Sequence, residues 1–295
     1  MTQLAIDRPP PTARAPLLRT GNGVRRVAHL SDVHMLESGP VASILQDLAI
    51  RLVSVGRAVD AGARTRRFER ALAAAVRSGA DHLVISGDLT EVGTDRQFEA
   101  FAEVLHGSGI APENVTLVPG NHDAYTSGEA WRRALEGPLR AYRGTAADED
   151  GKVVDRGGIL FLPVDVSCPQ PITRSAGELS PSAAALLESR FSDPGLRGRP
   201  MVVVQHHPPF EHERGAWQWL DGLRGSARLM ASLVRHPHVQ VLHGHLHKAV
   251  DRLVGLGKSR VLGAPATVED LHGGARVRLY ELRDGQLEAI GVATA

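Results

Sequence analysis

The sequence RVAHLSDVH, residues 26–34, joins a short apolar run to an aspartate and a histidine that stand two residues apart. Five further short runs are also rich in β-branched and other apolar residues. Each is bounded by Gly, Pro, Asp or Asn, which is typical of buried β-strands. The six predicted strands are 26–30, 81–86, 114–118, 159–166, 201–205 and 239–242.

Segments with helical periodicity lie between these runs. Residues 68–77, 95–105 and 226–235 each place apolar side chains on one helical face. Residues 180–191 begin with serine and proline, an N-cap residue followed by the residue favoured at the first helical position. Strands that alternate with helices indicate a layered α/β domain. From residue 250 to 292, alternation of apolar and polar residues predicts antiparallel strands that close a second sheet.

The segment 36–66 carries apolar residues at helical spacing, namely Leu45, Leu48, Leu52, Val55 and Val59. This spacing suits an amphipathic helix. We expect that helix to pack beside the loop that follows the first strand. A helix that binds a partner or a second copy of the chain is the alternative.

Composition places the chain among globular proteins. It has 295 residues, of which 42% are hydrophobic and 23% charged, and a formal net charge of +1. Such a chain has no overall field that would recruit nucleic acid or an anionic membrane. The single cysteine, Cys168, excludes an internal disulfide and is typical of the reducing cytoplasm. No apolar run has the length of a signal peptide or membrane helix, so we expect a cytoplasmic protein. Proline-rich residues 1–23 predict a flexible arm, and 24–295 a single domain.

Polar blocks directly follow five of the predicted strands: Asp32-Val33-His34, Gly87-Asp88, Gly120-Asn121-His122-Asp123, His206-His207-Pro208 and Gly244-His245-Leu246-His247. Because sites in open α/β sheets form at the carboxyl ends of strands, we expect these blocks to meet at one edge. Carboxylate, amide and imidazole groups without thiolates suit zinc, iron or manganese. The candidates outnumber the ligands of one tetrahedral ion, which favours two ions bridged by a carboxylate.

In this order the blocks resemble those of the calcineurin-like metallophosphoesterases. Their surroundings are HLSDVH at 29–34, SGDLTEVG at 86–93 and VPGNHD at 118–123. These are most similar to the bacterial class III cyclic nucleotide phosphodiesterases and glycerophosphodiesterases. The resemblance implies an α/β fold of four layers, a metallophosphoesterase sandwich of two mixed β-sheets flanked by helices.

The resemblance also implies a role for each site residue. The first ion would be held by Asp32, His34 and His247, the second by Asn121, His206 and His245, with Asp88 as the bridge. His207, next to His206, is the alternative ligand in that block. His122 would face the phosphate, stabilising developing charge or protonating the leaving oxygen, and Asp123 would orient it through a hydrogen bond to its other ring nitrogen. Gly87, Gly120 and Gly244 each precede a site residue, where a side chain would obstruct the backbone or the ions.

The predicted activity is hydrolysis of a small-molecule phosphoester by a hydroxide that bridges two ions of manganese, iron or zinc. A phosphodiester of the cyclic nucleotide or glycerophosphodiester type is the expected substrate. A phosphomonoesterase, a nucleotide-sugar pyrophosphatase and a noncatalytic metal-binding scaffold are the alternatives. No nucleic acid polymer or membrane partner is expected, and a homo-oligomer remains open. Trp217 and Trp219 follow the His206 block, where they either pack in the interior or wall the substrate pocket.

Overall fold

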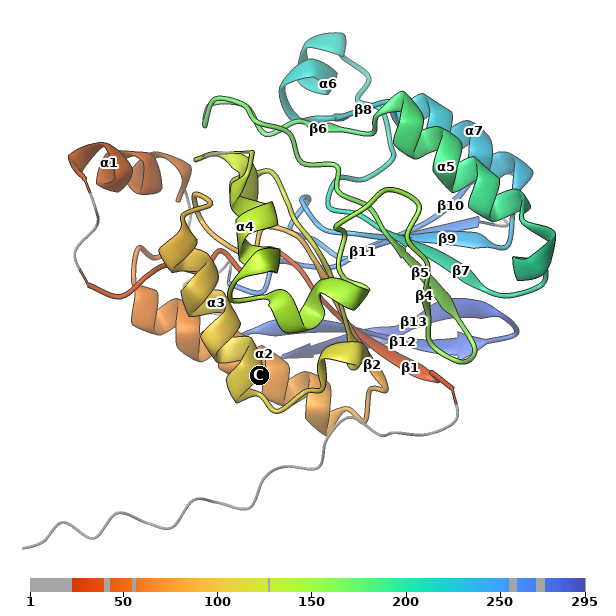
Figure 1. Ribbon diagram of the computed structural model, residues 1–295, viewed down its shortest axis with the longest axis horizontal. Helices are drawn as coiled ribbons and strands as arrows, with labels where there is room; N and C mark the ends of the chain where they lie inside the picture. Colours follow the sequence, from red (N-terminus) through yellow and green to blue (C-terminus); the bar gives the residue numbers. More distant parts are fainter. Residues whose placement is uncertain are drawn as a thin grey trace, which may run out of the picture.

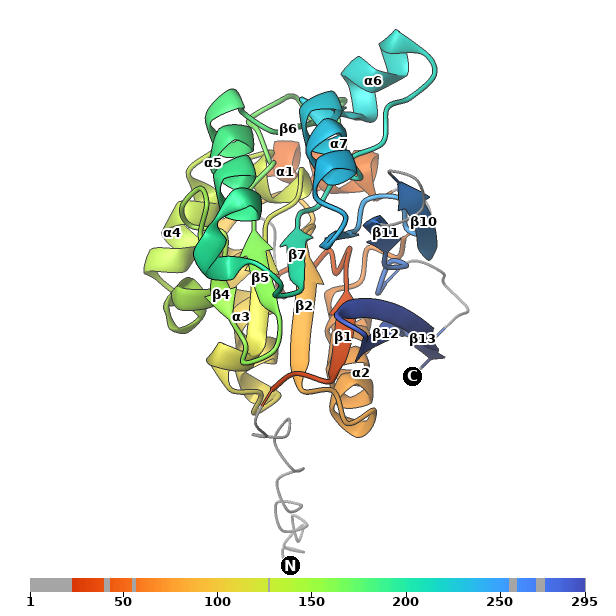
Figure 2. The same ribbon diagram turned by 90° about the vertical axis from the view of Figure 1, so that its right-hand side faces the viewer.

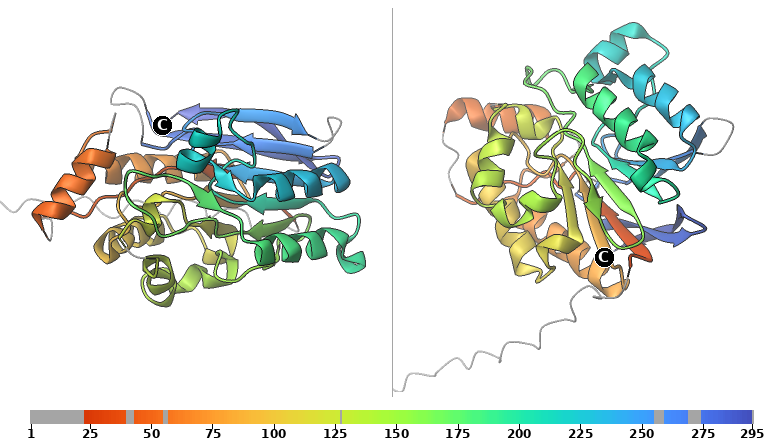
Figure 3. Two further views of the ribbon diagram at one scale, coloured as in Figure 1. Left: turned by 90° about the horizontal axis from the view of Figure 1, so that it is seen from above. Right: turned by 45° about the vertical axis from the view of Figure 1, so that its right-hand side comes forward.

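The fold consists of two β-sheets packed face to face, with helices on both outer faces (Figures 1 and 3). The computed structural model describes residues 23–39, 43–54, 57–126, 128–254, 259–268 and 274–294. The predicted arm, apart from Gly23, lies outside these residues. The four layers match the predicted metallophosphoesterase sandwich, and the α/β class is confirmed.

The first sheet has the strand order β13-β12-β1-β2-β3. Its parallel strands are β1 (Arg26–Leu30), β2 (His82–Ser86) and β3 (Val115–Val118). The antiparallel hairpin of β12 (Arg276–Arg283) and β13 (Gln286–Thr294) pairs with the free edge of β1. The outer face of the first sheet packs against α2 (Ala61–Arg77), α3 (Asp95–Gly107) and α4 (Ala130–Glu136).

The second sheet has the order β10-β11-β9-β7-β5-β4. Its strands are β4 (Val154–Asp155), β5 (Leu160–Pro163), β7 (Met201–Val204), β9 (Val239–His243), β10 (Val250–Val254) and β11 (Ser259–Gly263). Its outer face packs against α5 (Pro181–Ser192) and α7 (Ser226–Arg235). A separate apolar core between the sheets contains side chains of both, including Val27, Phe161 and Tyr280.

Shorter elements connect these layers. They are the 3₁₀ helices η1 (Pro112–Asn114), η2 (His122–Ala124), η3 (Arg140–Thr145) and η4 (Pro194–Leu196), the helix α6 (Gly215–Asp221), and the paired strands β6 (Gly177–Glu178) and β8 (Leu223–Arg224). Ser180 caps α5 with Pro181 at its first position, as predicted. Among the described residues, no helix is long and apolar enough to cross a membrane.

The C-terminal strands differ from the sequence prediction. Residues 250–292 were expected to close a second sheet, but only β10 and β11 belong to it. The hairpin β12–β13 instead extends the first sheet, where Arg26 pairs with Glu281 and His29 with Arg278. Alternation of apolar and polar residues predicts a strand but not the sheet edge that it joins. Here the hairpin covers the edge of β1, which would otherwise expose unpaired backbone groups.

The helix expected within 36–66 is α1 (Ile44–Val53), and it packs against the loop after β1 as predicted, but not through its larger apolar face. Leu45 and Leu48 are 78% and 60% exposed, and Leu52 is also exposed. The helix instead turns Ile50 inward, where it contacts Leu36 and Val92. Ile50 lies on the opposite helical face from the leucines, so a small cluster, rather than the larger apolar stripe, orients α1. Val55 lies outside the described residues.

Candidate metal centre

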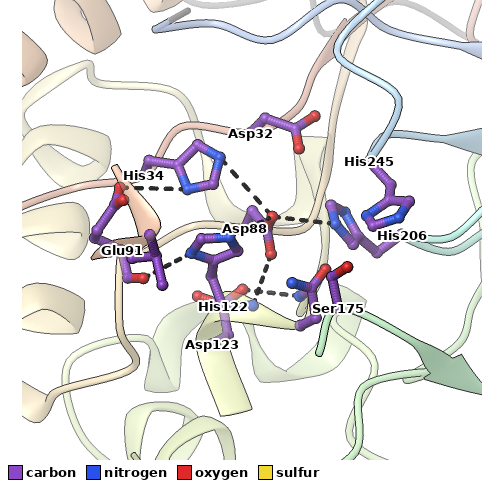
Figure 4. Close-up of polar contacts among 12 residues, drawn as sticks. Asp32, His34, Asp88, Glu91, His122, Asp123, Ser175, His206 and His245 are labelled. Carbon is purple, nitrogen blue, oxygen red and sulfur yellow. Dashed lines mark hydrogen bonds and ion pairs between the residues drawn. The ribbon is translucent and has the colours of Figure 1, made fainter. Parts of the chain in front are cut away.

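The predicted site residues meet at the edge where β1, β2, β3, β7 and β9 end. Asp32 and His34 follow β1, Asp88 follows β2, and Asn121 follows β3 at the start of η2. From the second sheet, His206 follows β7, while His245 and His247 follow β9. Figure 4 shows the side chains of Asp32, His34, His122, His206 and His245 grouped around Asp88. The edge predicted from the sequence is therefore the place where these groups gather.

The turns that carry these side chains have an unusual backbone. Five site residues on these turns have a positive φ: Asp32 (54°), His34 (49°), Asp88 (49°), His245 (67°) and His247 (54°). Among the described residues, Asp284 in the β12–β13 turn is the other non-glycine residue with this conformation. Residues other than glycine adopt it at an energetic cost, and such positions cluster at functional sites. The Asp-x-His and His-x-His pairs are therefore on turns rather than on extended strand.

The Asp88 carboxylate lies at the centre of the cluster. Its Oδ1 accepts a hydrogen bond of 2.9 Å from the backbone N–H of His122. Its Oδ2 is 3.2 Å from His206 Nε2, 3.8 Å from His34 Nε2 and 3.9 Å from His122 Nε2. One carboxylate oxygen thus faces three imidazoles that come from both sheets.

Three overlapping groups of side chains bring their ligand-type atoms within 4.8 Å of one another: Asp32, His34 and His247; Asp32, Asp88 and His206; and His34, Glu91 and His122. These groups are found among the described residues. They place five of the predicted ligands in one continuous cluster and add Glu91, for which no role was predicted from the sequence. His245 lies beside this cluster, with its ring centroid 5.3 Å from that of His206.

Several buried polar atoms in the cluster have no hydrogen-bond partner among the described residues. They are Asp32 Oδ2, His34 Nε2, Asn121 Oδ1 and His206 Nε2. The approaches of His34 and His206 to Asp88 have the distances of ion pairs but not the geometry of hydrogen bonds. Burying such atoms without partners is costly, and all four are typical donors to a divalent metal. The donor set fits two transition metal ions.

Contacts on the far side of each ring fix the proton of the imidazoles. His206 Nδ1 donates to the carbonyl of Ser86 (2.7 Å) and His122 Nδ1 to that of Glu91 (2.7 Å). Because a carbonyl only accepts, Nδ1 carries a proton in both rings, and Nε2 is the nitrogen that faces Asp88. His207 instead bonds Ser175 O through Nε2, at 2.6 Å. Of the tandem histidines, His206 is the one that faces Asp88.

Electrostatics in the cluster are dominated by burial and by Asp88. Burial lowers the pKa of His34 well below its usual value, which favours the neutral form that binds metals. Burial acts in the same direction on His206, but the Asp88 carboxylate outweighs it and raises the pKa of His206 to about 9. A metal ion at His206 therefore has to displace a proton.

The prediction that Asp123 accepts a hydrogen bond from the His122 ring is wrong. Asp123 Oδ2 accepts from the backbone N–H of Leu89 (3.0 Å) and Gly120 (2.8 Å), and Oδ1 accepts from the N–H and hydroxyl of Thr90. The η2 turn directs consecutive side chains apart, so Asp123 joins the two turns after β2 and β3. The carbonyl of Glu91 takes the contact with His122 that was assigned to Asp123.

Glu91 also anchors the site to the helices. Its buried carboxylate forms ion pairs with Arg64 of α2 and with Arg57 (2.9 Å), and it accepts a hydrogen bond from Ser54 (2.7 Å). Its Oε2 lies 3.5 Å from His34 Nδ1. The side chain and carbonyl of one residue thus contact both His34 and His122, and two arginines neutralise the buried charge.

We expect Arg64→Met to lower the free energy of unfolding by about 3 kcal/mol, because it leaves the buried Glu91 carboxylate with too little compensation. Arg64 is 2% exposed and also donates to the carbonyl of His34. Urea unfolding followed by circular dichroism measures the change. Arg132→Met on α4, whose side chain is 59% exposed in its ion pairs, is the matched control and should cost less than about 1 kcal/mol. Equal losses of unfolding free energy in both variants would show that the buried Arg64–Glu91 ion pair stabilises the fold no more than an exposed one does.

The three glycines expected at close approaches are confirmed in that role. A Cβ on Gly87 would lie 2.6 Å from His206 Nδ1. One on Gly120 would collide with the backbone nitrogen and carboxylate of Asp88, and one on Gly244 would collide with Ser31 Oγ. The strand ends approach one another so closely that no side chain fits at these positions.

The four layers and the edge cluster define a phosphoesterase of the metallophosphoesterase fold. The family model for calcineurin-like phosphoesterases matches residues 25–249. The chain belongs to the calcineurin-like phosphoesterase family and is a metal-dependent phosphoester hydrolase. The resemblance of the sequence to the calcineurin-like metallophosphoesterases is confirmed.

Solved structures share the fold at low identity. A dimetal phosphatase from Danio rerio has a TM-score of 0.66 and 13% identity, over 92% of this chain and 96% of that chain. The protein TT1561 of Thermus thermophilus has a TM-score of 0.55 and 18% identity, over 92% of this chain and 99% of that chain. At such identities the likeness shows the fold alone. Among curated proteins, none matches this sequence.

Proposed function

We propose that the chain is a dinuclear metal-dependent phosphodiesterase that acts on small phosphodiesters of the cyclic nucleotide or glycerophosphodiester type. The observation that carries this proposal is the set of buried, unpartnered oxygen and nitrogen atoms around Asp88. Burying such atoms without partners carries an energetic cost, so they support the bound metal that the proposed hydrolysis requires.

Two sets of residues would hold the ions. Asp32, His34 and His247 would bind the first ion, and Asn121, His206 and His245 the second, with Asp88 between them. The mutual approach of the first three supports the first set. In the second set, Asn121 donates from Nδ2 to the hydroxyl of Tyr125 (2.8 Å), which leaves Oδ1 buried without a hydrogen-bond partner. Because imidazole and carboxylate or amide groups are mixed, we propose manganese, iron or zinc as the native metals.

When bound, the two ions would supply Lewis-acid stabilisation of the phosphate oxygens and a water of lowered pKa at neutral pH. The chain itself supplies His122. Its Nδ1 is held by the carbonyl of Glu91, and its Nε2 faces the space in front of Asp88. In its protonated form, His122 would donate from Nε2 to the leaving oxygen of the ester. Asp123 would act as a positioning residue by joining the turns on which Asp88 and His122 stand.

The substrate would extend from this edge towards α6. Trp217 and Trp219 are 52% and 60% exposed, so they do not serve as core residues. Arg174 lies over the ring of Trp219, with 4.6 Å between Cζ and the ring centroid. Aromatic faces of this kind bind planar or apolar parts of a ligand, which supports an organic diester as the substrate. The single cysteine supports the cytoplasm as the proposed location.

The proposal predicts that the manganese-loaded protein hydrolyses bis(p-nitrophenyl) phosphate faster than p-nitrophenyl phosphate. A second charge on the monoester and the lack of a second organic group both disfavour it in a site built for diesters. The comparison is made as kcat/KM on the protein loaded separately with Mn, Fe and Zn. Predominant monoester turnover would replace the diesterase with a phosphomonoesterase. Absence of turnover with every metal would favour the scaffold.

A further inference from the structure

The helix α6 stands out because none of its residues is buried. It has seven residues and lies at the far end of the molecule from the start of β1, beyond β6 and α7 (Figures 1 and 2). So short a helix is unstable without packing, and α6 has no interior face that could hold it. Its placement therefore depends on a few polar contacts, and the tryptophans that it carries move with it.

The polar contacts at its C-terminal end lead directly to the proposed metal centre. His245 Nε2 lies 3.0 Å from Asp221 Oδ1 and 3.1 Å from the Asp221 carbonyl oxygen. The hydroxyl of Ser175 donates to the same Oδ1 (2.5 Å), and the N–H of Ser175 donates to Leu220 O (2.9 Å). On the other side, His212 Nε2 is 3.8 Å from Asp221 Oδ2. Asp221 is thus the residue of α6 that touches a predicted ligand.

The contact with Asp221 determines which ring nitrogen of His245 carries the proton. Both partners of His245 Nε2 accept hydrogen bonds, so Nε2 carries the proton and Nδ1 presents the lone pair. A carboxylate that receives the second ring N–H of a metal-bound histidine fixes the orientation of the ring and raises its basicity. We propose that Asp221 is the positioning residue of His245, and that metal binding at His245 orders α6 through this bond. This inference rests on the proposed function.

The proposed coupling between metal binding at His245 and the ordering of α6 acts in both directions. A metal ion on Nδ1 polarises the ring and makes Nε2–H a stronger donor, which stabilises the ordered position of α6. By linkage, the contacts that order α6 must raise the affinity of the centre for metal by the same factor. Trp217 and Trp219, which α6 carries, are then held in a more ordered position when the site is loaded. The metal centre would therefore control the position of Trp217 and Trp219 as well as the chemistry.

The test combines metal affinity with hydrogen–deuterium exchange of the full chain. Titration with MnCl₂ should show that Asp221→Ala weakens binding of manganese by about tenfold to a hundredfold. Asp221→Asn keeps an acceptor oxygen and should lose less. In the wild type, manganese should slow exchange across residues 212–222, and in Asp221→Ala this protection should be absent even at saturating manganese. Asp47→Ala on the exposed helix α1, which removes an ion pair with Arg51, is the matched control.

The outcomes separate this inference from the proposed function. If the wild type binds manganese and hydrolyses the diester but exchange in 212–222 does not respond to the metal, the coupling is wrong and the function stands. If Asp221→Ala speeds exchange equally with and without manganese and leaves the affinity unchanged, Asp221 is only a structural contact of α6. A wild type that binds no manganese, iron or zinc overturns both proposals. The exchange measurement on the wild type requires no variant to fold.

Discussion

Replacing Asp88 with alanine is expected to abolish phosphoester hydrolysis and to reduce the metal content of the purified protein. Asp88 Oδ2 lies within 3.9 Å of the Nε2 atoms of three histidines, and Oδ1 holds the backbone N–H of His122. Removal of this carboxylate takes away the proposed bridge and the negative charge at the centre of the cluster. Because it would disable both ions together, we expect kcat/KM to fall by more than about 10³-fold.

Elemental analysis and bis(p-nitrophenyl) phosphate turnover measure the two effects on Asp88→Ala. Asp81→Asn is the matched control at the opposite end of β2, where Asp81 Oδ2 accepts the backbone N–H groups of Arg25 and Arg26. It should keep its metal and its activity, with a loss of about 1 kcal/mol in stability. Chelation followed by addition of MnCl₂ should restore the wild type but not Asp88→Ala. An active Asp88→Ala variant with full metal content would show that Asp88 is no ligand.

The location of the site could be predicted because its signals are local in the sequence. Each polar block begins within two residues of the end of a buried strand, and the carboxyl ends of parallel strands meet at one edge. The glycines carry a similar local signal, since Gly87, Gly120 and Gly244 directly precede the site residues Asp88, Asn121 and His245, although the atoms that crowd them belong to other strand ends. The blocks share one edge because the strands that precede them run in the same direction. The alternation of strands with helices in the sequence predicts that parallel direction.

Contacts that depend on distant segments could not be predicted in this way. Glu91 belongs to the stretch SGDLTEVG at 86–93, but its importance comes from Arg57 and Arg64, which lie 34 and 27 residues away. Asp221 follows two tryptophans and shows no pattern of its own, although its carboxylate meets His245. For Asp123, adjacency in sequence suggested a contact with His122 that the η2 turn prevents. Side-chain direction within a turn, unlike strand direction, is not visible in a periodic pattern.

The exposed face of α1 and the placement of β12 and β13 have a common cause. Periodicity reports that one face of an element is apolar, but the surrounding structure decides which neighbour that face meets. In α1 the inward contact is made by Ile50, so Leu45 and Leu48 remain exposed. In the C-terminal hairpin the deciding factor is the unpaired edge of β1. Both outcomes depend on tertiary geometry that no window of ten residues contains.

Replacing His122 with alanine is expected to leave metal content unchanged and to lower kcat by about 10²- to 10⁴-fold. His122 Nδ1 is engaged with the carbonyl of Glu91, and its side chain is 11% exposed whereas those of His34 and His206 are fully buried, so a substrate can reach it and the role of proton donor fits it better than that of ligand. His106→Ala on the exposed surface of α3 is the matched control and should be fully active. Loss of metal in His122→Ala would make His122 a ligand.

The leaving group identifies what His122 does in the reaction. p-Nitrophenolate leaves readily without a proton, whereas an alkoxide needs one, so a general acid matters more for an alkyl ester. We therefore expect His122→Ala to lose at least tenfold more activity on a glycerophosphodiester or cyclic nucleotide than on bis(p-nitrophenyl) phosphate. Elemental analysis on the same samples verifies equal metal loading. Equal losses on both kinds of ester would assign His122 to stabilisation of charge on the phosphate, because that contribution does not depend on the basicity of the leaving oxygen.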